Sequence, residues 1–215
     1  MTSELQSLIE RLYPSRVFKD RDDQSRPLFL ANTKAVATVV VERLSQCNGI
    51  EVGPWNEDDE ATRAIQITTF RPSRRERDRI RNLPSSERLR LLRSQGGMYW
   101  HYMSIFISNV APFYQYRFLG VKAPEFPGEG LRVIFKSVDA SEDQVQLVEL
   151  DNSPLPEFWK DIVDIAETAL LSHNKRVLST AEASEEVPWL DIRGSDLEEA
   201  GHTVVTVYDC FFGLS

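Results

Sequence analysis

The sequence contains few of the residues that metal sites and thiol chemistry require. Its 215 residues include two cysteines, Cys47 and Cys210, and three histidines, His101, His173 and His202. The cysteines lie far apart and lack CxxC spacing, which is typical of a reduced compartment and argues against a disulfide framework. The histidines show no HxH or HExxH spacing. The sequence therefore predicts no metal site, no cofactor and no catalytic residue.

Long apolar runs are also missing. The chain begins Met-Thr-Ser-Glu-Leu-Gln, without the basic residues and apolar stretch of a signal peptide. No apolar stretch approaches the roughly 20 residues that a membrane span needs. We therefore expect a cytoplasmic protein with no membrane partner. A chain of 215 residues suits a single domain, 1–215, that buries its core without disulfide or metal support.

Positive charge is scarce in the chain as a whole. There are 25 lysines and arginines against 33 acids, which gives a formal net charge of −8 and a pI near 5.0. An acidic surface repels a phosphate backbone, so nucleic acid is a disfavoured partner. The basic residues that are present are unevenly distributed.

Much of the positive charge lies in one segment, 71–93. It contains nine arginines, no lysine and three acids, so its formal charge is +6 while the rest of the chain carries −14. Arginine binds carboxylates and phosphates through paired hydrogen bonds, which favours recognition of an acidic partner. The alternative is that these side chains contact solvent or the chain's own acidic surface. The candidate partner-binding residues are Arg74, Arg75, Arg77, Arg79 and Arg81.

The local pattern of this segment predicts two short helices. From 73 to 82 only Ile80 is apolar, so this part should be largely solvated. Serines at 85 and 86 are good helix starts, and they precede Leu89 and Leu92, which we expect to point inward.

Helical spacing recurs elsewhere in the chain. Apolar residues repeat every three to four positions over 5–12 and over 158–170, which predicts amphipathic helices near both chain ends. A further helix is predicted over 32–48. The β-branched run 39–41 opposes that prediction, because such side chains lose rotamer freedom in a helix.

The middle of the chain has the alternating pattern of strands. Short connections between these segments favour an antiparallel meander over a parallel sheet. We therefore predict an α+β fold, with an antiparallel sheet of about five to six strands and helices near both chain ends packed on one face. The predicted strands cover 61–70, 98–108, 113–119, 131–137, 144–150 and 203–212.

Aromatic residues are concentrated between 99 and 118, in the two strands of a predicted hairpin. Because strand side chains alternate, both faces of this hairpin carry aromatics, so either both faces are covered or one serves as a binding face or pocket wall. The candidate aromatic face consists of Tyr99, Trp100, Tyr102, Tyr114 and Tyr116.

Three hypotheses for function follow. The first is a non-catalytic module that binds another protein, for example an inhibitor or an immunity protein that neutralises a toxin, because opposed charges speed association without chemistry. The second is an enzyme or small-ligand binder whose pocket is lined by the aromatic hairpin 98–119, with His101 or an acid as its polar group. The third is nucleic-acid contact through segment 71–93.

Overall fold

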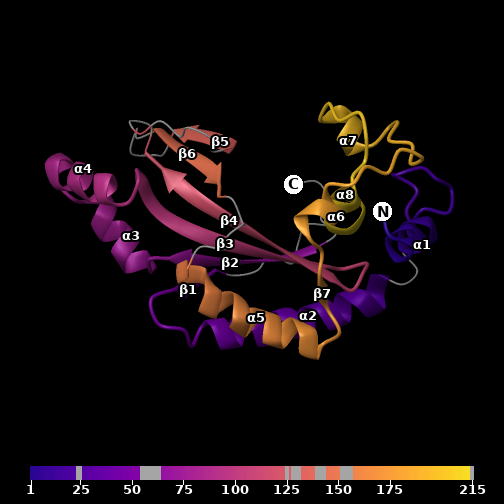
Figure 1. The fold of residues 1–215 in the computed structure, drawn as a ribbon, viewed down its shortest axis with the longest axis horizontal. Helices are drawn as coiled ribbons and strands as arrows, with labels where there is room; N and C mark the ends of the chain where they lie inside the picture. Colours follow the sequence, from indigo (N-terminus) through magenta and orange to yellow (C-terminus); the bar gives the residue numbers. More distant parts are fainter. Residues whose placement is uncertain are drawn as a thin grey trace.

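A computed structural model describes residues 1–22, 26–53, 64–123, 126, 132–138, 144–150 and 157–213. Within these residues the chain forms one mostly antiparallel sheet with helices packed around it (Figure 1). The predicted α+β class is confirmed. Parts of the predicted strands and turns, at 61–63, 131 and 139–143, lie outside the described residues.

Five strands of six or more residues make up most of the sheet. The strand order is β1-β2-β3-β4-β6-β5, and each neighbouring pair is antiparallel. The sequence predicted an antiparallel sheet. Among the described strands, the two-residue strand β7 departs from this prediction, because it pairs with β4 in parallel. The strands are β1 (Glu51–Val52), β2 (Ala64–Arg71), β3 (Met98–Ser108), β4 (Phe113–Lys122), β5 (Arg132–Val138), β6 (Gln144–Glu149) and β7 (Arg176–Val177).

Two long helices cover one face of the sheet, as predicted. Helix α2 (Arg26–Leu44) and helix α5 (Lys160–Ser172), which follows the short 3-10 turn η1 (Glu157–Trp159), lie side by side beneath it (Figure 1). Val36, Val40 and Leu44 of α2 are buried against strands β2 and β3. This burial outweighs the poor helix propensity of the run 39–41. Helix α2 begins six residues before the predicted start at 32.

The other face is covered at one end by the first and last segments of the chain. Helix α1 (Ser3–Leu12) lies there with the short helices α6 (Thr180–Ala183), α7 (Asp196–Glu199) and α8 (Val207–Phe212) (Figure 1). Helices therefore flank the sheet on both faces, whereas the sequence predicted them on one.

The predicted strand over 203–212 is wrong, because its second half is helix α8. The Thr206 side chain accepts a hydrogen bond from the Asp209 backbone N–H, and the Asp209 carboxylate accepts from the Thr206 backbone, which is a capping box. Every residue of the helix is buried, so no polar face reveals a helical period. Cys210 is buried in this helix, where a thiol acts as packing.

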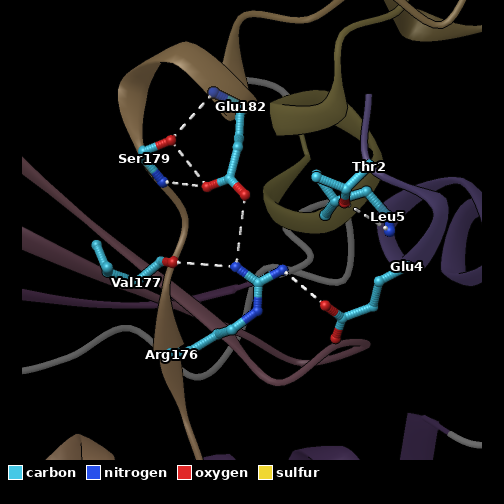
Figure 2. A network of polar contacts seen from close by, with 7 residues as sticks. All are labelled: Thr2, Glu4, Leu5, Arg176, Val177, Ser179 and Glu182. Carbon is cyan, nitrogen blue, oxygen red and sulfur yellow. Dashed lines mark hydrogen bonds and ion pairs between the residues drawn. The ribbon is translucent and has the colours of Figure 1, made fainter.

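Arg176 of β7 joins the N-terminal and C-terminal parts of the chain (Figure 2). Its guanidinium lies 3.4 Å from the Glu4 carboxylate of α1 and 3.6 Å from Glu182 of α6. The same group sits 4.3 Å above the Phe113 ring of β4. The Glu182 carboxylate also accepts hydrogen bonds from Ser179, which caps α6. One arginine thus fixes two helices against the end of the sheet.

Candidate functional site

The arginine-rich segment folds into two helices joined by a tight turn, which we call the arginine hairpin. It consists of α3 (Arg74–Arg81) and α4 (Ser85–Ser94), and it lies beyond the end of β2 and β3 opposite to α1 and α8 (Figure 1). Its contact with the sheet is narrow. Ile80 and Leu92 are buried there against Tyr99 and Trp100 of β3. Leu89, which was predicted to point inward, is 37% exposed.

A glycine turn brings the chain from α4 back into β3. The backbone of Gly97 has φ +83°, a conformation that side chains with a Cβ rarely adopt. A Cβ at this position would also collide with Phe126. The turn therefore requires glycine, and it sets the hairpin close above the start of β3.

Between the arginine hairpin and the sheet lies a cleft of about 370 Å³, which is partly open to solvent. Its surface is mostly apolar. The residues that line it belong to β2, α3, α4 and β3 or directly follow one of these elements. The lining residues are Arg71, Pro72, Glu76, Ile80, Leu91, Gln95, Tyr99, Trp100 and His101.

His101 and Arg71 face each other across the β2–β3 ladder at one side of the cleft. Burial lowers the pKa of His101 below its usual value, and the nearby Arg71 charge lowers it further. The imidazole is therefore neutral at pH 7 and can donate or accept a hydrogen bond. The guanidinium of Arg71 supplies positive charge beside it.

The negative charge of Glu76 is balanced within the hairpin. The Nε and Nη2 atoms of Arg79 donate to its two carboxylate oxygens, at 2.8 Å for Nε. The hydrogen bonds from Arg79 hold the pKa of Glu76 below its usual value. This carboxylate is consequently a poor general base, because its proton affinity is reduced.

The described residues that line the cleft include few of the types that act as nucleophiles. There is no serine, threonine, cysteine, lysine or aspartate among them, which leaves Glu76, Tyr99 and His101. In the described part of the chain no group of three histidine, cysteine or acidic residues is placed to hold a metal ion.

The five predicted partner-binding arginines differ in their surroundings. Arg77 lies half-buried, 4.3 Å above the Phe70 ring, and its guanidinium donates to the Pro72 carbonyl and to Glu51. Arg79 is bound to Glu76, and Arg81 lies 4.9 Å above the Trp100 ring. The side chains of Arg74 and Arg75 lie at the solvent-exposed surface of α3.

The five predicted aromatic residues also separate into two groups. Tyr99 and Trp100 line the cleft, and Tyr102 lies further along β3 with its ring 5.6 Å from that of Phe70. Tyr114 and Tyr116 point to the opposite face and pack under α5. Burial raises the pKa of Tyr114 to about 12 and that of Tyr116 further. Those two tyrosines belong to the core.

Several lining residues were not predicted as site residues. Arg71 falls inside the arginine-rich segment but stood outside the five candidates, and Leu91 and Gln95 gave no signal of their own. They reach the cleft because α4 returns over β3, which local periodicity does not report. The second hypothesis from the sequence, in contrast, named His101 or an acid as the polar group of an aromatic pocket, and His101 does line the cleft.

In the described part of the chain, no helix is long and apolar enough to cross a membrane. Comparison with known proteins provides no relative from which a role could be transferred: no family model, curated protein or solved structure matches this chain.

Proposed function

We propose that this protein binds a small ligand in the cleft between the arginine hairpin and β3. The observation that carries the proposal is the cleft itself: about 370 Å³, mostly apolar, with Arg71 and His101 at one side. Small-molecule sites have this character, an apolar cleft of roughly 300–1,000 Å³ with a few polar groups that orient the ligand. The proposal assigns binding and names no reaction.

The aromatic wall supports the proposal. Tyr99 and Trp100 have ring centroids 5.8 Å apart, and both contribute to the lining with Ile80 and Leu91. Aromatic side chains contribute large contact areas and add a preference for ring-shaped partners. The second sequence hypothesis, a binder lined by the aromatic hairpin, is therefore favoured over the other two.

The proposal is tested by measuring the binding of a small aromatic ligand before and after a substitution that fills the cleft. We expect isothermal titration calorimetry to show binding of a naphthalene compound, 2-naphthoate or 2-naphthylmethanol, to the unmodified protein. Leu91→Trp places a bulky side chain in the lining and should abolish that binding. Leu89→Trp is the matched control, because it makes the same change on the same helix at an exposed position.

Two results would contradict the proposal. One is that neither naphthalene compound binds the unmodified protein. The other is that Leu91→Trp, still folded by circular dichroism, binds the compounds as tightly as Leu89→Trp does.

A second candidate function, the protein-binding module, is supported by the exposed arginines of α3. Arg74 and Arg75 lie at the surface within a segment of formal charge +6 on a chain that is otherwise acidic. A partner with an acidic surface, such as a toxin that this protein neutralises, would be attracted to that surface. Under this proposal a stoichiometric partner co-purifies from the native host and is lost with the double change Arg74→Glu and Arg75→Glu. Arg43→Glu, at an exposed position of α2, should retain it. Retention by the double variant would contradict the module.

A further inference from the structure

We propose that the ligand of the cleft is a planar aromatic molecule with a single anionic group, such as an aromatic carboxylic acid. Its ring packs against the Tyr99–Trp100 wall and its anion is bound by Arg71. The inference rests on the proposed binding function and deepens it by naming the class of ligand.

The charges around the cleft select for an anion. Glu76 is bound on both oxygens by Arg79, so its negative charge is compensated. His101 is neutral at pH 7, because burial and the charge of Arg71 lower its pKa. The segment 71–93 that forms most of the lining has a formal charge of +6. By formal charge the segment around the cleft is therefore positive, in contrast with the acidic remainder of the chain.

Arg71 is the one cationic side chain among the described residues that line the cleft. It ends β2 opposite His101, and it is exposed. A guanidinium has five N–H donors arranged as a planar fork. It can therefore hold a carboxylate through two parallel hydrogen bonds while it keeps contacts within the protein. Neutral His101 can donate one further hydrogen bond to the same group.

The lining also limits how much charge the ligand carries. Besides Glu76 and Gln95, the rest of the lining consists of Pro72, Ile80, Leu91 and the two aromatic residues. A group with two or three charges would lose hydration there without enough donors to replace it. Inorganic phosphate should consequently bind weakly, whereas a ring with one carboxylate satisfies both the apolar wall and Arg71.

The experiment compares four probes of matched size or charge by calorimetry: 2-naphthoate, 2-naphthylmethanol, 2-naphthylmethylamine and inorganic phosphate. We expect 2-naphthoate to bind about 10-fold tighter than the alcohol, the effect of one charge-assisted hydrogen-bonded pair. The amine and phosphate should bind more weakly still. Added salt should weaken binding of the carboxylate more than that of the alcohol.

Two substitutions of Arg71 test whether this residue binds the carboxylate. Arg71→Gln should lower the affinity for 2-naphthoate about 10-fold and leave that for the alcohol unchanged, which also shows that the cleft is intact. Arg71→Lys should restore part of the loss, because it returns the charge without the planar fork. Arg75→Gln removes a charge from the exposed surface of α3 outside the lining and should change neither affinity.

The outcomes separate the two proposals. If the acid and the alcohol bind equally well, or if Arg71→Gln leaves the affinity for the acid unchanged, the anionic class is wrong and the binding function stands. If phosphate binds as tightly as the acid, the aromatic requirement is wrong. If no naphthalene compound binds, the proposed function itself fails.

Discussion

The two ends of the β3–β4 hairpin differ in how closely they are packed. At the loop end, Val110 and Phe113 are buried in a large cluster with α1 and α8, and the Phe113 and Phe211 rings lie 4.8 Å apart. At the opposite end, Tyr99 and Trp100 belong to a smaller described cluster with Ile80, Leu92 and Ala123, and a cleft lies beside them.

The polar side chains at the two ends of the hairpin also differ in their surroundings. At the loop end the Ser108 hydroxyl donates to the Phe211 carbonyl at 2.6 Å and accepts from the backbone N–H groups of Val110 and Ala111. These hydrogen bonds join the loop to α8. At the cleft end, His101 and Arg71 are among the residues that line the cleft. The aromatic hairpin is thus closely packed at its loop end, whereas its other end borders the cleft that we propose as a ligand site.

The largest expected contrast is in folding stability. Phe211→Ala, at a fully buried position of the loop end, should lower the free energy of unfolding by about 3–5 kcal/mol, because it removes buried area and leaves a void. Leu91→Ala at the cleft should cost only about 1 kcal/mol, since this side chain is half-buried and already borders a cavity. Urea denaturation measures both changes.

Equal losses from these two substitutions would contradict the comparison. They would mean that the cleft end contributes to the core as much as the loop end does. The slope of the urea transition should stay constant in both variants, because a change in the slope would report altered compactness instead of lost packing.

Much of the fold was predictable because its main elements have periodic patterns. Helices α1 and α5 show their apolar spacing in the sequence, and β2, β3 and β4 show alternation. Helix α8 was missed because the stretch 207–212 is apolar except for Asp209, a composition that is also typical of a buried strand. Its capping box, Thr206 with Asp209, was the available signal for a helix start.

The candidate site was predictable in its parts but not in its assembly. The sequence identified the arginine-rich segment and the aromatic strand, and it named His101 as a pocket group. It did not predict that α4 returns over β3, which depends on the Gly97 turn and on burial of Ile80 and Leu92. Which arginines turn inward depends on where aromatic rings lie in three dimensions, as Arg77 above Phe70 shows.

The loop end also contains a buried lysine, for which we expect a smaller effect on stability than for Phe211. Lys175 is 2% exposed. Its ammonium donates to the Thr33 hydroxyl and to the carbonyls of Ser108 and Ala111, at 3.0, 3.2 and 3.4 Å. These contacts join α2 to the β3–β4 loop. Burial lowers the pKa of Lys175 to about 8, from 10.5 for an ordinary lysine.

The sign of the pH effect follows from this shift. Between the two pKa values the unfolded chain binds a proton that the folded chain has released, so stability rises with pH. From about pH 8 to about pH 9.5 the gain should be about 1.5 kcal/mol, because the slope reaches its full 1.36 kcal/mol for each pH unit only once folded Lys175 has lost its proton. Measurements should stop there, because burial raises the pKa of Tyr102 to about 12 and ionisation of tyrosines in the unfolded chain then lowers stability.

Lys175→Met should remove the rise, because methionine has no proton to release. Lys160→Met, at an exposed position of α5 where the lysine pairs with Glu157, should retain it. Thermal or urea unfolding at several pH values measures all three proteins. Parallel curves for the unmodified protein and Lys175→Met would mean that Lys175 keeps an ordinary pKa in the folded state, and that the loop end is more hydrated than its packing indicates. A flat curve for Lys175→Met alone would support a dry loop end, in contrast with the partly open cleft at the other end of the same strands.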